Sequence, residues 1–422
     1  MTAHARAPAG IMLRAMGVAD TVAGLTGFQG RGAGTDTERR AAAWLRQELQ
    51  TGRRQATVET FWSRPNWALA HAWHTLLALA GSLVSVASPK IGGALILVAL
   101  VSLAVDALTG VSLGRRLTFE HASQNVVSPP PVEGKRVRLI ITANYDAGRM
   151  GLVHRPVLRT AGARLRTTAG AAALGWQAWL AIGFAWLLVT AIMRSGGAGG
   201  QALGIAQLIP TAALVLTLAM LLELASSAFG PSAGDNASGV AVALALARVL
   251  DVSPPRNLGV EVVLQGASDG SMVGLARYLR ARRKERSAAH TIVLGIAACT
   301  AGRPRFWTGD GTMVPLRLQP RLCTVAAAAV GPGTELGARP YRARGTSAAF
   351  PARLAGLPAL TIGRLDSRGL VPRSHLPDDL VGAVDGAALD QTVELALTLV
   401  DAIDAGLDRT ATGRAASSRT AA

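Results

Sequence analysis

Long apolar segments alternate with amphipathic ones along the chain. Four apolar segments, at 67–88, 91–113, 171–193 and 202–225, each exceed the ~20 residues that an α-helix needs to cross the hydrocarbon core of a bilayer. Very short connections join the first to the second and the third to the fourth. Since buried core helices seldom run so long without charge, the pattern predicts four membrane spans in two helical hairpins.

Asp106 and Glu223 lie toward the ends of two predicted spans, and the sequence assigns them no role. A carboxylate within a span is usually functional or paired, but near a span end it reaches the interface at little cost. Four spans and two such carboxylates are also the only features that favour a transporter subunit.

The segments between the hairpins alternate between strand and helix patterns. An amphipathic helix is predicted at 34–49, with Thr35 and Glu38 at capping-box spacing. Strands are predicted at 55–62, 136–146, 258–268 and 290–299, and further helices at 240–250 and 272–286. This alternation predicts an α/β fold with a mixed, largely parallel sheet flanked by helices.

The two hairpins divide a single body into three segments. The predicted organisation is a first body segment at 1–66, hairpin 1 at 67–113, a second body segment at 114–170, hairpin 2 at 171–225, a third body segment at 226–407 and a disordered tail at 408–422. Each hairpin returns the chain to its starting side, so the three segments share one side of the membrane. Arginines crowd the flanks on that side, whereas the hairpin tips carry only Lys90 and Arg194. The positive-inside rule therefore predicts an inner-membrane protein with a cytoplasmic body.

The chain is strongly basic, with 43 Lys and Arg against 26 Asp and Glu and a net charge of +17. Such a charge favours anionic surfaces. There is no zinc-knuckle spacing and no basic helix interleaved with aromatics, so we expect anionic lipid headgroups as partners and no nucleic acid. A basic run at 277–286 is typical of a solvated helix face, and contact with anionic lipid is the alternative.

Polar residues follow several predicted strands. Asp146, Ser268, Asp269 and Cys299 lie at or near strand ends, where ligands bind in open α/β sheets. The segment SAGDNASG at 232–239 precedes a predicted helix and has two interpretations. Asp235 or Ser238 caps the helix, or Asp235 holds a metal ion. Asp378 and Asp379 are predicted to cap the last helix.

Several segments resemble the two-zinc aminopeptidases of metallopeptidase family twenty-eight, a group that includes glutamate carboxypeptidases. The resemblance rests on GRGAGTDTERRAAAWLRQEL, VETFW, SQNVV, ANYD, AGDNASGVAVALALARVL, VVLQGASDGSMVGLARYL and SHLPDDL, and it covers nearly all of the body. It implies a mixed sheet flanked by helices and two zinc ions. The ligands would be a histidine, a bridging aspartate, a glutamate, a second aspartate and a late histidine, with a further glutamate as general base.

The resemblance keeps some of these functional positions. It implies that Asp235 is the bridging carboxylate, that His375 is the late histidine and that Asp146 orients the first histidine. Asn144 stands where that zinc-binding histidine is expected, and Ser268 stands at the general-base position.

Two further ligand positions also differ. Asp269 replaces the ligand glutamate with a shorter side chain, and the second aspartate falls among Ala297, Ala298 and Cys299. A carboxamide is a far poorer zinc ligand than an imidazole, and a general base supplies about 10²- to 10⁴-fold of the rate. Zinc, held weakly if at all, would depend on Asp235, Asp269 and His375.

These replacements lead to a hypothesis and an alternative. The hypothesis is a catalytically inactive pseudopeptidase whose cleft acts as a binding or regulatory module for a peptide, lipid or protein partner. The alternative is an active, membrane-tethered metallo-aminopeptidase with an altered, one-zinc site. A serine hydrolase at Ser268 has little support, because no histidine partner can be assigned from the sequence.

Overall fold

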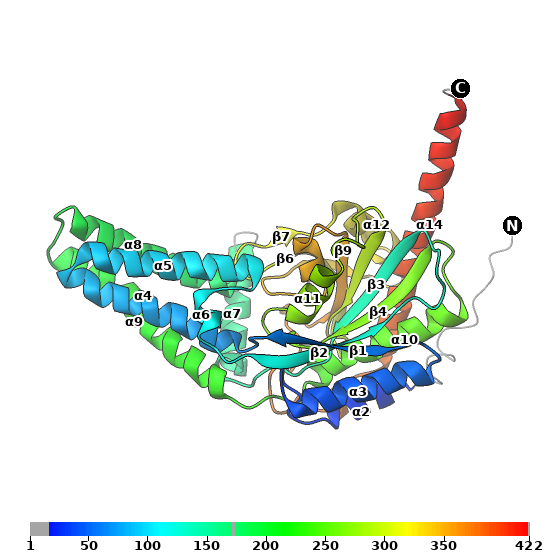
Figure 1. The fold of residues 1–422 in the computed structure, drawn as a ribbon, viewed down its shortest axis with the longest axis horizontal. Coiled ribbons are helices and arrows are strands. Elements are labelled where there is room, and N and C mark those ends of the chain that lie inside the picture. The colour runs from blue at the N-terminus through cyan, green and yellow to red at the C-terminus, as the bar shows by residue number, and fades with distance from the viewer. Residues whose placement is uncertain (1–16, 171–173, 421–422) are drawn as a thin grey trace.

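A mixed sheet forms the centre of the body (Figure 1). The structure is a computed structural model that describes residues 17–170 and 174–420, with side chains to residue 408. Within these residues the sheet has nine strands in the order β1-β2-β4-β3-β5-β9-β6-β7, with β8 paired to β6. The strands are β1 (Thr57–Ser63), β2 (His121–Ser128), β3 (Val137–Asn144), β4 (Leu258–Gln265), β5 (Thr291–Ile296), β6 (Arg303–Asp310), β7 (Leu316–Arg317), β8 (Arg339–Arg342) and β9 (Ala359–Leu365).

The central strands β4, β3, β5 and β9 run parallel, and the pairings β1–β2, β2–β4, β6–β7 and β6–β9 are antiparallel. The mixed α/β sheet flanked by helices is therefore confirmed. β2, β6, β7, β8 and β9 add to the four strands predicted from hydrophobic patterning.

Helices cover both faces of the sheet. On one face lie α2 (Val18–Thr26), α3 (Asp36–Thr51), α10 (Ser238–Val252), α12 (Pro320–Val330) and α14 (Gly386–Thr420); on the other lie α11 (Val273–Ala281) and α13 (Phe350–Leu354). Successive strand residues point to opposite faces, so Val126 packs in the first layer and Val127 in the second. Both faces are buried, which explains why β3 and β4 are almost continuously apolar.

The predicted helix at 34–49 corresponds to α3. The Thr35 Oγ1 accepts a hydrogen bond from the Glu38 N–H at 3.1 Å, and the Glu38 carboxylate accepts the N–H of Gly34 at 2.7 Å. The other carboxylate oxygen accepts from the Ser123 hydroxyl at 2.6 Å and the Ala267 N–H at 3.1 Å. The capping residue thus also joins the helix to the ends of β2 and β4.

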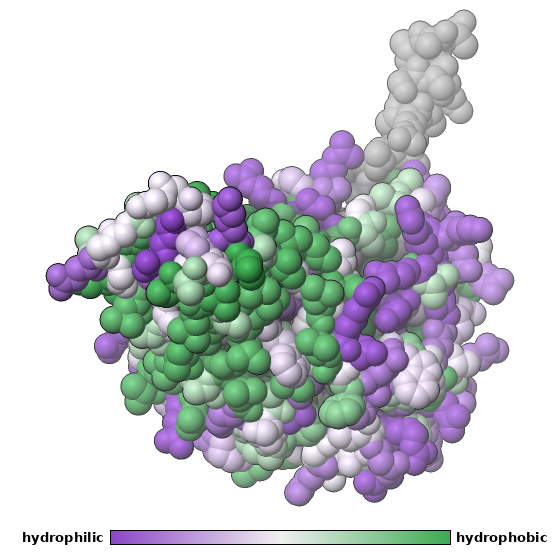
Figure 2. All heavy atoms as spheres, turned by 60° about the vertical axis from the view of Figure 1, so that its left-hand side comes forward, coloured by the Kyte–Doolittle hydropathy of each residue, from purple (hydrophilic) through white to green (hydrophobic). Residues whose placement is uncertain are grey.

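Four long apolar helices project from one end of the body (Figure 1). They are α4 (Trp67–Ala87), α5 (Pro89–Thr109), α8 (Trp176–Ser195) and α9 (Gln201–Ser226). Hydrophobic side chains gather over their outer surface (Figure 2). α8 begins at Trp176, and residues 171–173 of the predicted third span lie outside the described residues.

Within the described residues, five helices are long and apolar enough to cross a membrane. The fifth, at Ala233–Val252, differs because 83% of its apolar stretch is buried inside the protein, against 22–56% for the four projecting helices. It includes α10, which packs on the sheet through Val240, Ala243 and Leu244. We therefore assign it to the core of the body.

Short elements connect the layers. They are α6 (Leu113–Arg116), η1 (Leu152–His154), α7 (Pro156–Ala169), the π-helical turn η3 (Ala233–Ala237) and η4 (Val381–Ala383). At the C-terminus the backbone continues as α14 to Thr420, where the sequence predicted a disordered tail at 408–422; residues 421–422 lie outside the described residues.

Polar side chains meet where the projecting helices join the body, and we call them the junction cluster: His71, His74, Asp106, Arg115 and Gln177. The Asp106 carboxylate lies 2.6 Å from the Arg115 Nε and 3.4 Å from the His71 Nε2. Gln177 contacts His71 at 3.1 Å, and His74 contacts Ser102 at 2.9 Å. Asp106 is therefore a buried, paired carboxylate, whereas Glu223 accepts the N–H of Leu152 at 2.9 Å in a more exposed position.

Candidate functional site

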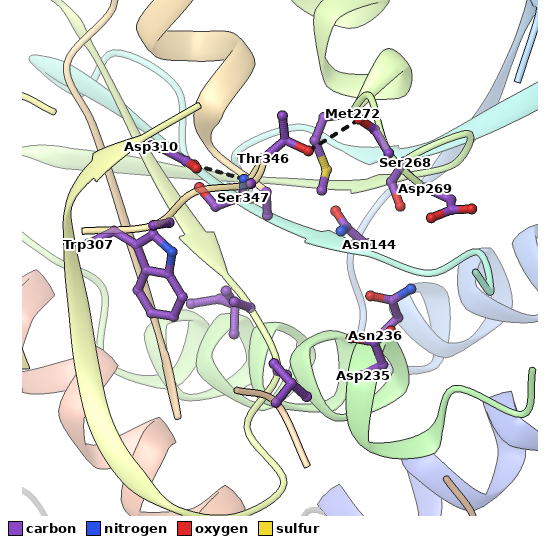
Figure 3. A pocket seen from close by; sticks show the side chains of 18 of the residues that line it. Asn144, Asp235, Asn236, Ser268, Asp269, Met272, Trp307, Asp310, Thr346 and Ser347 are labelled. Atoms are coloured by element: carbon purple, nitrogen blue, oxygen red, sulfur yellow. Dashed lines mark hydrogen bonds between the residues drawn. The ribbon is translucent and has the colours of Figure 1, made fainter. Parts of the chain in front are cut away.

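A cavity of about 220 Å³ lies at the carboxyl ends of β3, β4 and β5 and is closed on its far side by β6. We call it the cleft. Figure 3 shows Asn144, Ser268 and Asp269 on one side, Asp235 and Asn236 below them, and Trp307 and Asp310 across the cavity. His375, Ala297 and Ala298 also line the cleft. The structure therefore brings Asn144, Asp235, Ser268, Asp269 and His375 together, in the region expected for an open parallel sheet.

Asn144 ends β3, and its buried Oδ1 has no hydrogen-bond partner among the described residues. Asp146 lies two residues further on and is fully buried. Its carboxylate accepts the N–H groups of Ser268 at 2.9 Å and Asp269 at 3.2 Å, and also the Ser268 hydroxyl. Burial raises the pKa of Asp146 to about 6. The Ser268 hydroxyl therefore serves an internal hydrogen bond.

Asp235 and His375 form an ionisable pair in the cleft. Asp235 lies in η3, and its Oδ2 is 3.5 Å from the His375 Nε2. The His375 Nδ1–H donates to the carbonyl of Arg149 at 3.0 Å, which leaves Nε2 facing Asp235. Burial lowers the pKa of His375, but the carboxylates of Asp235 and Asp269 outweigh it and leave that pKa above its usual value. The His154 ring stacks on His375, with centroids 4.1 Å apart.

The turn that carries Asp235 is capped from a distant region of the chain. The Asp379 carboxylate accepts the N–H groups of Gly234 at 2.8 Å and Asp235 at 3.1 Å. The prediction that Asp235 or Ser238 caps this helix is wrong, because α10 has no side-chain cap and the Ser238 hydroxyl donates to the Gly234 carbonyl. Asp379 also does not cap the last helix. Burial and the charge of Asp235 raise the pKa of Asp379 to about 6.

Asp269 is held by the first projecting helix. The indole N–H of Trp67, the first residue of α4, donates to the Asp269 Oδ2 at 3.2 Å. This contact joins the base of the helical bundle directly to the cleft.

Cys299 lies outside the cleft. Its side chain is buried in the apolar core next to α10, where the thiol donates to the Ala297 carbonyl at 3.0 Å and burial raises its pKa to about 12. Ala297 and Ala298 line the cleft in its place. A neutral buried thiol is a poor metal ligand, since the thiolate is the species that binds.

The donors in the cleft do not fit a two-zinc centre. Among the described residues, no group of three or more His, Cys, Asp and Glu side chains gathers closely enough to hold a metal ion. Structural and catalytic zinc sites use three or four protein ligands. Asp235 and His375 supply two, and Asp269 is directed toward Trp67.

Sequence patterns missed three features of the site. Asp310 is buried in the far wall, where it accepts the N–H of Ser347 at 2.7 Å, and burial raises its pKa to about 7. The guanidinium of Arg31, fully buried, donates to the carbonyls of Tyr145, Pro231 and Ser232. The ring of His154 stacks on that of His375. No motif marks Asp310 or His154, whereas Arg31 is enclosed between two glycines in GRG.

Comparisons with known proteins agree with this architecture. A family model described as peptidase family M28 matches residues 222–400. A zinc aminopeptidase from Bacillus subtilis superposes with a TM-score of 0.52 at 13% identity, covering 92% of this chain and 94% of that one. An aminopeptidase from Aneurinibacillus sp. strain AM-1 superposes with a TM-score of 0.51 at 14% identity, covering 92% of this chain and 93% of that one.

A glutaminyl cyclase from Bacteroides thetaiotaomicron, bound to N-acetylhistamine, superposes with a TM-score of 0.50 at 12% identity, covering 91% of this chain and 96% of that one. A search of curated proteins found no match. The family model over residues 222–400 and the structural neighbours together support an M28 metallopeptidase-like fold for the body.

Proposed function

We propose that this chain is a multi-span membrane protein whose peptidase-like body binds a partner in its cleft and does not hydrolyse peptides. One observation carries the proposal. The positions that the resemblance assigns to a zinc-binding histidine, the general base and a zinc-binding aspartate are occupied in the cleft by Asn144, Ser268 and the Ala297–Ala298 pair. The fold is retained, and the chemistry that the family requires is not.

The position that the resemblance assigns to the family's general base carries Ser268, which has no carboxylate. Among the described residues that line the cleft, none is a glutamate. Glu38 reaches the Ala267 N–H behind the cleft but belongs to the α3 cap. Serine cannot take up a proton near neutral pH without its own base, and the Ser268 hydroxyl donates a hydrogen bond to the Asp146 carboxylate.

The cleft retains features of a binding site. Its volume is below the ~300–1,000 Å³ of typical small-molecule pockets, which favours a single terminal group or side chain of a larger partner. Asp235 and Asp269 line it with carboxylates. We therefore favour a partner with a cationic group, such as the amino terminus of a peptide or protein.

Peptide hydrolysis tests this proposal. The detergent-purified full chain would be incubated with a panel of amino-terminally unblocked peptides and added zinc or cobalt. We expect no turnover above that of Asp235→Ala. Asp378→Ala, which removes an exposed carboxylate 3.3 Å from the Arg373 Nε, is the matched control. Turnover in wild type and control that disappears in Asp235→Ala would contradict the proposal.

Membrane embedding is the other component of the proposal. α4, α5, α8 and α9 have the length and hydropathy of membrane spans, and their outer surface is apolar (Figure 2). We infer two membrane hairpins and a body on the cytoplasmic side of the inner membrane, because the arginine-rich flanks lie on the body side. Cosedimentation with membranes after alkaline carbonate washing tests the embedding.

Thiol labelling in whole cells tests the orientation separately. Both native cysteines are removed, and one cysteine is introduced at the hairpin tip, Gly197→Cys, or on the body, Gly333→Cys. Both positions have room for a side chain, because no atom of the described residues other than the adjacent ones lies within 4 Å of the place that the new Cβ would occupy, and the strain from the positive φ of +89° at Gly197 and +100° at Gly333 applies to both variants alike. We expect an impermeant reagent to label position 197 and spare position 333. The reverse pattern would place the body outside.

An altered metallo-aminopeptidase is the alternative, and the Asp235–His375 pair favours it. These two side chains face each other across 3.5 Å at the edge of the cleft. A single zinc held there by two protein ligands, with Asp269 as a third after rotation, would activate a water molecule when bound. Full zinc occupancy together with pH-dependent hydrolysis would support this alternative.

A further inference from the structure

A second, larger cavity lies at the base of the projecting helices. Its volume is about 780 Å³, and it opens between the end of α5 with α6 and the body elements α11 and α13. We call it the junction cavity. Gly270 and Thr346 line both the junction cavity and the cleft, so the two cavities adjoin. The cleft therefore has a neighbour at the level where the helical bundle meets the body.

Arginines dominate the polar wall of the junction cavity. Two carboxylates line the cavity, those of Asp106 and Glu120. The six arginines that line it are Arg64, Arg115, Arg116, Arg277, Arg280 and Arg283. Arg115 is paired with Asp106, and Arg64 lies 3.9 Å from Glu120. Among the residues that the structure describes, no carboxylate forms a salt bridge with the remaining four. The cavity wall thus carries an excess of positive charge.

The four arginines come from two directions. Arg277, Arg280 and Arg283 recur every three residues along α11 and the turn after it, and all three are exposed. Arg116 ends α6, which follows the last turn of α5. Several guanidinium groups converging on one space can bind a phosphate through paired N–H donors.

Apolar residues continue from the cavity along the outside of the bundle. Leu108 and Val111 line the cavity, and Leu108 is 67% exposed. Leu97, Val101, Val105 and Leu108 are all exposed and recur at helical spacing, so they form one stripe on α5. From Leu97 to Leu108 this stripe is about 16 Å long at 1.5 Å per residue.

We propose that the junction cavity is a binding site for an anionic phospholipid, with its phosphate headgroup among the arginines and an acyl chain along the α5 stripe. The inference rests on the membrane placement proposed above. It also gives the basic segment at 277–286 a specific role in place of a solvated face. A basic pocket at the edge of a helical bundle is typical of sites for anionic headgroups.

The combination of charge and apolar surface selects a lipid over other anions. A free phosphate would bind the arginines and leave the apolar α5 stripe exposed to solvent. A nucleic acid would require basic side chains spread along a surface, whereas here they surround a cavity that adjoins apolar helices. A neutral phospholipid would cover the stripe and leave four guanidinium groups without an anionic partner.

Native mass spectrometry of the detergent-purified full chain tests the site. The chain is delipidated and titrated with phosphatidylglycerol, phosphatidylcholine or inorganic phosphate. We expect retained phosphatidylglycerol in wild type and at least about tenfold weaker retention in the triple variant Arg277→Gln/Arg280→Gln/Arg283→Gln. Phosphatidylcholine and inorganic phosphate should bind no better to wild type than to this variant.

The control removes the same charge elsewhere. Arg303→Gln/Arg321→Gln/Arg339→Gln changes three exposed arginines on β6, α12 and β8, and it should retain phosphatidylglycerol as wild type does. Arg116→Gln alone, on the other wall, should weaken retention in the same direction.

Three outcomes would overturn the inference. They are equal losses in cavity and control variants, equal retention of phosphatidylcholine and phosphatidylglycerol by wild type, and displacement of the lipid by inorganic phosphate at equal concentration. Each leaves the membrane placement intact, because carbonate washing tests that placement independently.

Discussion

The junction cluster and the cleft contain the same kinds of side chain, and Trp67 contacts both. In the junction cluster, Asp106 is paired with Arg115 at 2.6 Å and approached by His71 at 3.4 Å. In the cleft, Asp235 and His375 are 3.5 Å apart, and the Asn144 Oδ1 is buried without a partner among the described residues.

The difference separates polar groups that maintain structure from polar groups available to a ligand. Buried charges are stable when paired and hydrogen-bonded, as in the junction cluster. An unpaired buried oxygen costs free energy and requires an explanation, such as a water molecule, an ion or a ligand that pairs with it. The comparison therefore assigns a structural role to Asp106, which the sequence left unassigned, and supports the binding role that we propose for the cleft.

The largest effect is expected in the junction cluster. Asp106→Asn leaves the Arg115 guanidinium, only 6% exposed, without its charge partner. We expect a loss of about 3–5 kcal/mol in the free energy of unfolding, measured by thermal unfolding in detergent. Glu223→Gln, the control, should cost less than about 1 kcal/mol, because Glu223 accepts one hydrogen bond in an exposed position. Similar losses in both would refute the structural role of the Asp106–Arg115 pair.

A pH effect is expected from the far wall of the cleft. Burial raises the pKa of Asp310 from 3.8 to about 7, so the folded protein holds a proton that the unfolded chain releases. The contribution of Asp310 to the free energy of unfolding is fully present below pH 4. It decreases as the pH rises from 4 through 7, by up to about 1.4 kcal/mol per pH unit. Asp310→Asn should remove this contribution to the slope. An unchanged slope in melting temperature between pH 4 and 8 would contradict the assignment.

A smaller effect is expected at the cap of the Asp235 turn. Asp379→Ala leaves the N–H groups of Gly234 and Asp235 without their acceptor and should cost about 1–2 kcal/mol. The neighbouring Asp378→Ala loses only an exposed ion pair with Arg373 and should cost less than about 0.5 kcal/mol. Chemical or thermal unfolding of the two variants side by side checks this, and equal costs would exclude Asp379 as the cap.

The smallest effect concerns the contact that joins the two regions. Trp67→Phe keeps an aromatic ring but removes the N–H that donates to Asp269, at an expected cost of about 1 kcal/mol. Trp176→Phe is the matched control, because the ring centroids of Trp176 and Trp67 are 5.2 Å apart. The indole N–H of Trp176 donates no hydrogen bond among the described residues. If the control loses as much stability in thermal unfolding, ring packing and not the hydrogen bond is responsible.

Local patterns predicted much of the fold. The strands β1, β3, β4 and β5 and the helices α3, α10 and α11 follow from alternation and helical spacing in segments of about ten residues. β6 and β9 were not predicted from hydrophobic patterning. β6 reads RPRFWTGD, in which arginines and a proline obscure the alternation, and its place in the sheet depends on pairing with distant β9.

The site was predictable only to a limited extent. The resemblance assigned Asp235, Ser268, Asp269 and His375 to one site, and all four line the cleft. Contacts between distant segments were not predictable: Asp379 with Gly234, 145 residues away, Trp67 with Asp269, 202 residues away, and His154 with His375. Such contacts form only when the chain folds, and no regular spacing of residues in the sequence indicates them.

Metal content of the purified protein tests the central claim most directly. Wild type and Asp235→Ala would be dialysed against trace zinc in detergent, and zinc per chain would be measured by elemental analysis. We predict no zinc in wild type above the level in Asp235→Ala, because among the described residues no three His, Cys, Asp or Glu side chains gather closely enough to hold a metal ion, and the cleft offers only the Asp235–His375 pair at 3.5 Å. One or two zinc ions per chain, lost in Asp235→Ala, would contradict this prediction and would make the cleft a working metal centre.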